Sequence, residues 1–354
     1  MEKLSILYKS IINEINWDDD FDDVKKSCQP TKDVVDYLNK RKANFGKDTK
    51  DREKFSQKYP FLHSNSKHFE SKSGFIEIDE FIKSITRPPK SYTGINEKMS
   101  KSGGANEHVY NTGIPSIRGI VYDIEHEKFY FIDTCPGAGA CKEYCYTLNG
   151  NYIRYQASFD NMTNRLNYMM NFPEKYEEGM YKELAKKCEE HKAFEGYKSR
   201  VVLRWNDSGD FFSKRYTQIA ESVMSRLKEA GYNIISYGYT KMADMNKDSE
   251  IATKFSSGAN KRQNDKVDKN ADKSIKLSPE ISKDLNLMKV EDEQTLKQRV
   301  AKQFKLDVNK LLTYDEIKST RQSDDNVWNV IVTPNDGDDA AFRPDVKNVY
   351  LVHH

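Results

Sequence analysis

The chain has 354 residues, a formal net charge of +2 and 37% hydrophobic residues. This length suits one large or two ordinary domains, and the charge lacks the strong basicity that is the usual footprint of nucleic-acid-binding proteins. The N-terminal region holds no apolar run as long as a signal peptide or a membrane span, so we expect a cytoplasmic protein with no membrane partner. Five cysteines, an odd number, favour a reducing compartment and a metal site over a disulfide framework.

Residues 1–86 form a predicted helical appendage, because Leu4, Leu7 and Ile11 fall at helical spacing. This segment carries no catalytic pattern, and we expect it to pack on the core or to bind a partner. The next residues, 87–104, contain two prolines with glycine and serine, which is typical of a linker or an ordered loop.

The centre of the chain alternates strand-like and helix-like segments. Strands are predicted at 117–124, 128–133, 201–205, 232–237, 327–332 and 346–352, and helices at 155–170, 175–191 and 213–230. Such alternation is typical of parallel strands with helices on the sheet faces, so the predicted fold class is α/β with a partial (β/α) barrel-like core. We assign this core to residues 105–255 and 325–354. Residues 256–324 are a predicted polar insertion, disordered over 256–280 and helical over 283–322.

Three cysteines, Cys135, Cys141 and Cys145, lie close together directly after the predicted strand 128–133. Thiolates are soft ligands that suit zinc and iron–sulfur clusters, and the glycines and proline among them suit a loop that wraps an ion. The spacing differs from the close pairs that are typical of zinc fingers. The sequence therefore predicts a metal or cluster site on this loop.

Three interpretations of the cysteine loop stay open. A four-iron cluster held by three cysteines would keep one iron open for a ligand or substrate. A zinc ion would need a fourth ligand, such as His108, His126 or His353. In the third interpretation the cysteines are reduced, buried side chains that bind no metal.

A second polar segment follows the predicted strand 201–205. It contains Asp207, Ser208, Gly209 and Asp210, and Arg204 precedes it. These side chains can bind an amino group, a ribose or a metal-bound water, although the same residues also make ordinary turns and helix caps. Tyr239 lies in a third polar segment after the next predicted strand. Because the carboxyl ends of parallel strands meet at one sheet edge, we expect these segments to face the cysteine loop.

Three segments together resemble the phage gene product eighty-eight family. They are the run from Cys135 with Cys-Pro-Gly-Ala and a later Cys-Tyr, the run Arg-x-x-Asp-Ser-Gly-Asp-Phe-Phe from Arg204, and Tyr-Thr-Lys from Tyr239. The resemblance covers roughly residues 105–260 and, weakly, residues 345–353. It implies a phage, prophage or mobile-element origin, and hence the cytoplasm of a host cell, without a settled activity.

A more distant similarity is to the radical S-adenosylmethionine superfamily, in which a strand leads into a three-cysteine loop that holds a four-iron cluster. There an aromatic residue precedes the last cysteine, as Tyr144 precedes Cys145 here. A short glycine- and acid-containing motif after the second strand of that superfamily binds the amino group of the methionine moiety, and Gly209 and Asp210 resemble it. The cysteine spacing of this chain is longer than in that superfamily.

The first functional hypothesis is therefore an iron–sulfur protein that resembles a radical S-adenosylmethionine enzyme. In this hypothesis the cluster ligands are Cys135, Cys141 and Cys145, the cofactor-binding residues are Asp207, Ser208, Gly209, Asp210 and Tyr239, and the catalytic residues are Arg204, Asp207 and Asp210. The substrate is unknown, and a phage origin favours a nucleotide or a nucleic acid. One alternative is a zinc-stabilised nucleic-acid-binding or host-interaction protein without catalysis. Another is a metal-dependent nuclease that uses Asp207 and Asp210.

Overall fold

A computed structural model of the chain describes residues 20–22, 24, 78–145, 147, 156–245, 249–277, 293–323, 325–333, 336–337 and 339–352. Most of the predicted N-terminal appendage, part of the predicted insertion (278–292) and His353 lie outside the described residues. The described chain divides into two compact units. Unit 1 takes the residues up to Thr93 together with 112–184 and 208–226, and unit 2 takes 94–111, 185–207 and the residues from Leu227 on.

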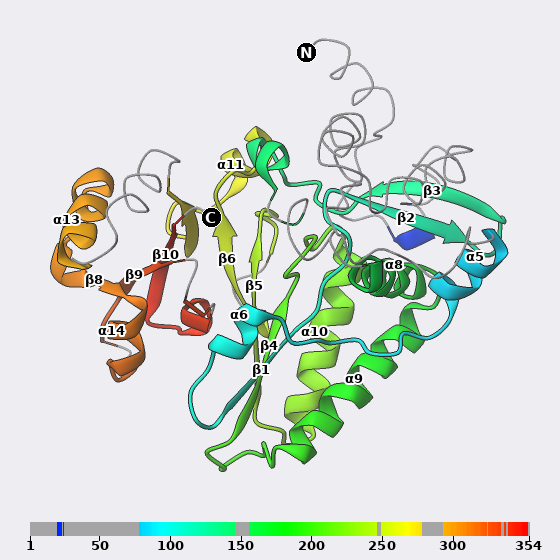
Figure 1. The fold of residues 1–354 in the computed structure, drawn as a ribbon, viewed down its shortest axis with the longest axis horizontal. Coiled ribbons are helices and arrows are strands. Elements are labelled where there is room, and N and C mark those ends of the chain that lie inside the picture. Colours follow the sequence, from blue (N-terminus) through cyan, green and yellow to red (C-terminus); the bar gives the residue numbers. More distant parts are fainter. Residues whose placement is uncertain are drawn as a thin grey trace, which may run out of the picture. The chain divides into compact units, whose positions relative to one another are not determined.

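Unit 2 is built on an eight-stranded sheet whose strands all run parallel (Figure 1). In spatial order the strands are β1 (Glu107–Asn111), β4 (Arg200–Trp205), β5 (Ile234–Thr240), β6 (Ile251–Ser256), β7 (Lys273–Lys276), β10 (Val346–Leu351), β9 (Trp328–Val332) and β8 (Leu311–Thr313). The other elements of this unit are α6 (Glu97–Lys101), α11 (Lys261–Lys266), α13 (Glu293–Phe304), η3 (Val308–Lys310), α14 (Tyr314–Ser319) and η4 (Asp339–Phe342).

The spatial order of the strands follows the chain order from β1 to β7, so successive crossovers step in one direction across the sheet. This is the winding of a (β/α) barrel, whereas a doubly wound sheet reverses near its middle. The order reverses only after β7, where β10 pairs with β7 and β8 forms the far edge. No closed barrel forms among the described strands. The predicted fold class, α/β with a partial barrel-like core of parallel strands, is confirmed.

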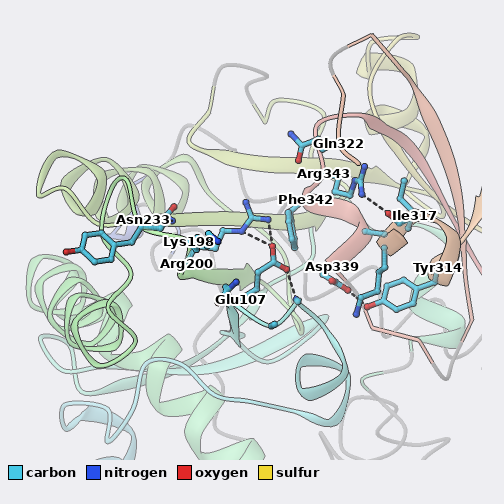
Figure 2. A pocket seen from close by; sticks show the side chains of 16 residues that line it. Glu107, Lys198, Arg200, Asn233, Tyr314, Ile317, Gln322, Asp339, Phe342 and Arg343 are labelled. Carbon is cyan, nitrogen blue, oxygen red and sulfur yellow. Dashed lines mark hydrogen bonds and ion pairs between the residues drawn. The ribbon is translucent and has the colours of Figure 1, made fainter. Parts of the chain in front are cut away.

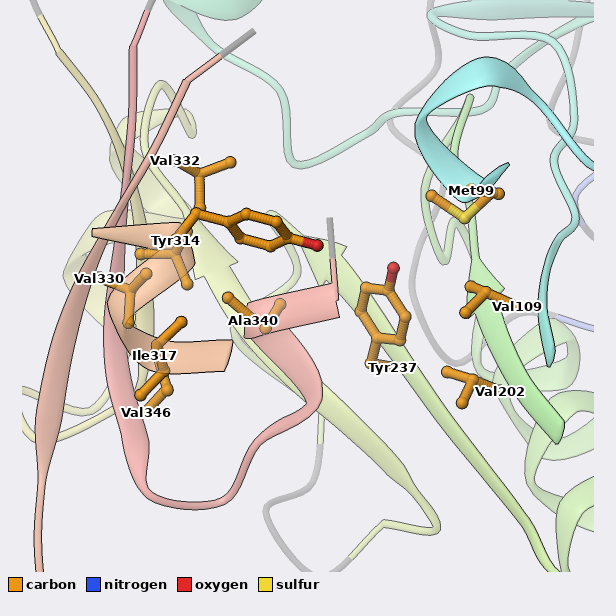
Figure 3. Close-up of a cluster of buried hydrophobic side chains, with 12 residues drawn as sticks. Met99, Val109, Val202, Tyr237, Tyr314, Ile317, Val330, Val332, Ala340 and Val346 are labelled. Carbon is orange, nitrogen blue, oxygen red and sulfur yellow. The ribbon is translucent and has the colours of Figure 1, made fainter. Parts of the chain in front are cut away.

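Two clusters of buried side chains pack against the strands of unit 2. On β9, Val330 and Val332 belong to the first cluster and Ile331 to the second, because successive side chains of a strand point to opposite faces. In the first cluster, Tyr237 of β5 lies between Ala340 of η4 and the valines of β1 and β4 (Figure 3).

The second cluster joins α13 to the end of the sheet. Leu296 and Val300 of this helix pack with Tyr350 of β10, and the ring of Phe304 lies 4.8 Å from that of Tyr350. Leu296 and Val300 are four residues apart and thus share one helix face, which explains why so polar a helix still packs on the core.

Unit 1 contains the predicted hairpin, which consists of β2 (Arg118–Asp123) and β3 (Lys128–Asp133). Its helices are α5 (Ile78–Thr86), α8 (Gln156–Asn171), most of α9 (Pro173–Glu190) and most of α10 (Lys214–Glu229). Asn167 and Asn171 lie one turn apart on α8. Their side-chain oxygens accept hydrogen bonds from the N–H groups of Tyr122, at 2.7 Å, and Ile124, at 3.2 Å. These bonds hold α8 against β2 and the residue that follows it.

Four strands lie where the sequence predicted none. They are β1 and β6 in the core and β7 and β8 in the region predicted to be a disordered and helical insertion. The last two are short, and β7 (Lys-Ser-Ile-Lys) has a single apolar side chain, so neither produces the alternation by which strands are recognised. The helix predicted over 283–322 is wrong in part, since η3, β8 and α14 follow α13 there.

Candidate functional site

The three predicted metal ligands lie in unit 1, on the segment that follows β3. Cys135 is buried two residues beyond the end of β3, Cys141 lies in the short helix η1 (Ala140–Tyr144), and Cys145 comes directly after that helix. The sequence interpretation placed this loop after a strand of the α/β sheet. The structure corrects that detail, because β3 pairs only with β2 in the separate two-stranded sheet.

Backbone hydrogen bonds fix the start of the cysteine loop. The N–H of Thr134 donates to the carbonyl of Ile117 at 3.2 Å, and the N–H of Ala138 donates to the carbonyl of Cys135 at 2.9 Å. The N–H of Ile117 in turn donates to the sulfur of Cys135 at 3.2 Å. An N–H group directed at a sulfur stabilises the thiolate form, which is the form that binds metals.

The segment Ser208–Asp210 lies directly against the cysteine loop within unit 1. The N–H of Asp210 donates to the carbonyl of Thr134 at 3.0 Å, and the carbonyl of Ser208 accepts from the N–H of Ile114 at 3.1 Å. Two of the predicted segments therefore do come together, as expected from the sequence.

Gly209 permits this close approach. Its φ is +79°, a conformation that favours glycine, and a Cβ atom there would lie 2.5 Å from a side-chain carbon of Ile114. The backbone conformation and the contact with Ile114 thus explain why glycine stands at position 209, without any catalytic role.

The sulfur of Cys135 lies in an environment that disfavours its unligated thiolate. Burial raises the pKa of this thiol well above its usual range, and the charges of Asp210 and Cys145 raise it further. The thiol therefore stays protonated at neutral pH in the absence of a cation. A bound metal would supply the missing positive charge and displace the proton, which couples metal binding to proton release.

The thiol ligands of the loop suit a thiophilic metal or cluster, but the described residues do not form a preorganised metal site. Among the described residues, no three histidine, cysteine, aspartate or glutamate side chains form a ready metal-binding group. Cys145 sits near Cys135, and its sulfur lies 3.0 Å from the hydroxyl of Thr147. Binding by all three cysteines would require their sulfurs to come closer together.

An unsatisfied hydroxyl accompanies the thiols. The Oγ atom of Ser208 is buried and has no hydrogen-bond partner among the described residues. A buried polar atom without a partner costs free energy, commonly about 1–3 kcal/mol. This cost marks Ser208 as a place where a polar ligand group fits.

The remaining predicted site residues belong to unit 2, at the carboxyl ends of its strands. The guanidinium of Arg204 on β4 lies 5.3 Å from the ring centre of Tyr239 on β5, so these two are brought together. Asp207 accepts hydrogen bonds from the side-chain amides of Asn96, at 3.2 Å, and of Asn111. The roles assigned to Arg204, Asp207 and Tyr239 stay predictions.

Asn96 and Asn111 are site residues that the sequence analysis missed. Asn96 caps α6, and Asn111 is the last residue of β1, a strand that was not predicted. The side-chain oxygen of Asn111 is buried without a partner among the described residues. Recognition of β1 would have placed Asn111 at the carboxyl edge, next to the strand that leads to Asp207.

None of the histidines considered as a fourth zinc ligand is a described neighbour of the cysteine loop within unit 1. His126 lies at the hairpin turn with its ring nitrogen 2.8 Å from Asp123, and the whole of β3 separates it from Cys135. His108 belongs to unit 2, where its ring stacks on that of His191 at 3.6 Å. His353 is not described.

A family model described as Gene product 88 matches residues 90–304. The match spans the three cysteines, the segment 207–210 and Tyr239, and it confirms the family predicted from these motifs. Comparisons with curated proteins and with solved structures gave no match. Within the described ranges, no helix is both long enough and apolar enough to cross a membrane.

Proposed function

The chain belongs to the Gene product 88 family, and on that premise we propose that it is an iron–sulfur enzyme of the radical S-adenosylmethionine type. Cys135, Cys141 and Cys145 bind the cluster, and Asp210 binds the amino group of S-adenosylmethionine. The observation that carries this proposal is the contact of the two loops, in which the N–H of Asp210 donates to the carbonyl of Thr134 at 3.0 Å. The one-directional order of β1 to β7 supports it only as an analogy of fold.

The cysteine loop supplies what a cluster with one open iron requires. Cys135, Cys141 and Cys145 would hold a four-iron cluster, and the iron without a protein ligand would stay open for a small molecule. When bound and reduced, such a cluster supplies an electron that cleaves a carbon–sulfur bond of the sulfonium. The N–H of Ile117, directed at the sulfur of Cys135, stabilises the thiolate and tunes the cluster potential.

The 208–210 segment supplies polar groups of the right kind beside the thiols. The carboxylate of Asp210 accepts the N–H of Phe211 at 2.8 Å, and a carboxylate has room for further donors such as an ammonium group. The unsatisfied hydroxyl of Ser208 lies in the same segment. Together they favour a ligand with hydrogen-bond donors next to the cysteine loop.

The first experiment measures iron, sulfide and zinc in protein purified without oxygen, together with its visible absorption spectrum. We expect a brown protein with about four irons per chain. Alanine at Cys135, Cys141 or Cys145 should remove the iron, whereas Cys188→Ala should keep it, because Cys188 lies on α9 in the part that belongs to unit 2 and not in the cysteine loop. A colourless protein that holds one zinc ion would overturn the cluster and favour the zinc-stabilised alternative.

The second experiment tests the 208–210 segment by equilibrium dialysis with S-adenosylmethionine. Asp210→Asn should weaken binding about tenfold or more, since a charge-assisted hydrogen bond is lost. The backbone contact of residue 210 does not involve its side chain, so the loop should keep its place. Glu174→Gln, at an exposed carboxylate of the same unit, is the control. Equal affinity of Asp210→Asn and the original protein would overturn the role of Asp210.

A further inference from the structure

Unit 2 contains a pocket at the amino ends of its strands, whereas Arg204 and Asp207 lie at the carboxyl ends. Its lining begins with Glu107 and Arg200, which are the first residues of β1 and β4, and continues with Asn233 just before β5. Phe342 and Arg343, which precede β10, close it on another side (Figure 2). The pocket thus lies at the amino ends of the strands, and nothing in the proposed cluster chemistry uses it.

The pocket carries an excess of positive charge. The cationic side chains of its lining are Lys198, Arg200, Lys318 and Arg343, and the carboxylates are Glu107 and Asp339. Arg343 is already neutralised, because it binds both carboxylate oxygens of Asp345 at 2.9 and 2.7 Å. The carboxyl of Asp339 accepts the hydroxyl of Tyr314 and, at 2.8 Å, the N–H of Gly103, and burial raises its pKa. Arg200 is likewise paired with Glu107, so Lys198 and Lys318 are the charges that favour an anionic ligand.

The two lysines are the cations best able to meet such a ligand. Both are exposed, and Lys198 makes no hydrogen bond or ion pair to any residue that the structure describes. Lys318 donates only to the carbonyl of Gly103, at 3.1 Å, and lies over the ring of Tyr314. Either ammonium group can turn to a phosphate without breaking an ion pair.

Arg200 and Phe342 form a platform beside these charges. The guanidinium of Arg200 lies over half-buried Phe342, 5.2 Å from its ring centre, and Glu107 holds it in place through a 2.8 Å hydrogen bond from its Nε atom (Figure 2). The N–H of Gly104 donates to the other oxygen of Glu107 at 2.8 Å, which fixes the pair further. Stacked arginine and aromatic groups of this kind bind nucleic-acid bases without regard to sequence.

We propose that this pocket binds a mononucleotide, with its phosphates on Lys198 and Lys318 and its base against the Arg200–Phe342 platform. The volume of about 580 Å³ lies in the range of small-molecule sites. That size favours a single nucleotide over a strand of nucleic acid, which needs a groove that follows its backbone.

The test is a titration of the whole protein with ATP, with adenosine and with tripolyphosphate, without added divalent metal. ATP should bind more tightly than either half of the molecule, and the affinity should fall with salt. The double variant Lys198→Glu and Lys318→Glu should weaken ATP binding about tenfold or more. Both side chains are exposed, so this variant should fold.

The matched control is Lys302→Glu with Lys305→Glu, at exposed lysines on and after α13 and outside the pocket lining. It changes the net charge equally and should leave ATP affinity unchanged. Phe342→Leu should weaken ATP but not tripolyphosphate, because only the base needs the ring. Equal weakening by both double variants would overturn the proposal, as would tighter binding of a short oligothymidylate than of ATP.

This proposal stands apart from the proposed cluster. Cys135→Ala, in unit 1, should leave ATP affinity unchanged. If the protein holds no iron but binds ATP, the pocket survives and the cluster fails. If the protein holds iron but ATP binds no better than tripolyphosphate, the nucleotide pocket fails and the cluster survives.

Discussion

Around Cys135 the chain is held mainly by hydrogen bonds from the N–H groups of Ile117 and Asp210, together with the ion pair of Lys142 and Asp133, whereas around Arg200 and Arg343 it is held by arginine–carboxylate pairs. The first region contains a thiol of raised pKa, and the hydroxyl of Ser208 there has no hydrogen-bond partner among the described residues. The second pairs Arg200 with Glu107 and Arg343 with Asp345, and keeps Lys198 and Lys318 without an ion pair among the described residues. The cysteine region thus resembles a site that a ligand must complete. The pocket resembles a preorganised site, in which ion pairs already position the side chains.

The two ways of holding a site respond differently to solution conditions. Backbone hydrogen bonds carry no net charge, so the contact between Asp210 and Thr134 should tolerate salt and moderate acid. Ion pairs weaken as salt screens them and fail when the carboxylate is protonated. Substitutions that change geometry in the cysteine region and charge in the pocket should therefore differ in how their effect on stability depends on salt and pH.

The largest effect is expected where the pocket is most buried. Arg343 and Asp345 form a two-bond pair whose side chains are 14% and 1% exposed. Asp345→Asn leaves the guanidinium without its counter-charge, and removal of one partner of a buried pair costs about 3–5 kcal/mol. We expect a loss of about that size in the free energy of unfolding by urea at pH 7, followed by circular dichroism. Asp325→Asn, at an exposed carboxyl nearby in the chain, should change little.

The Arg343–Asp345 pair should also make the stability of unit 2 depend on pH. Burial opposes ionisation of Asp345, but the hydrogen bonds and charge of Arg343 outweigh it and lower the pKa of this carboxyl. A lowered pKa adds stability above the unfolded value, which is about 4, and that stability is lost as the pH falls through the folded pKa. The Asp345→Asn variant should therefore lose less stability than the original protein below about pH 4. Parallel losses in both proteins would contradict this origin.

A smaller effect is expected in the cysteine region, and it should not depend on salt. Gly209→Ala places a Cβ atom 2.5 Å from Ile114 and forces a side chain into a left-handed conformation. Strain and overpacking together should cost about 2–3 kcal/mol. Gly196→Ala is the matched control, because Gly196 has a φ of +81° but no atom within 4 Å of the added Cβ. It should cost only about 1 kcal/mol. Equal losses would show that close approach to Ile114 is unimportant.

Much of the scaffold of both regions could be predicted from local patterns. The hairpin and β4, β5, β9 and β10 are runs of apolar or alternating residues, which identify strands without knowledge of their partners. The strand β1 (Glu-His-Val-Tyr-Asn) mixes polar and aromatic residues at the edge of the sheet, where one side needs no partner strand. Its pattern is therefore weak, and the strand was missed.

The two candidate sites differ in how much of each could be predicted from the sequence. Cysteines are rare and soft, so their clustering indicates a metal before any fold is known, and the Asp-Ser-Gly-Asp run carries its own turn signal. The pocket depends on a pair, Glu107 and Arg200, that is 93 residues apart in the chain. Only the register of β1 against β4 brings these two opposite each other, and missing β1 concealed the pocket.

The smallest effect should come from the Glu107–Arg200 pair itself, which is only partly buried, at 19% and 31% side-chain exposure. A double-mutant cycle with Glu107→Gln and Arg200→Gln should give a coupling free energy of about 1 kcal/mol, which falls as salt is raised. A cycle on Lys186 and Glu190, an exposed pair one turn apart on α9 at 3.7 Å, should give about 0.3 kcal/mol. Because Glu107 also fixes the arginine against Phe342, its loss should weaken ATP binding as well as stability. A coupling no larger than that of the exposed pair would mean that the pocket is not held by its charges, and that its difference from the cysteine region lies in shape alone.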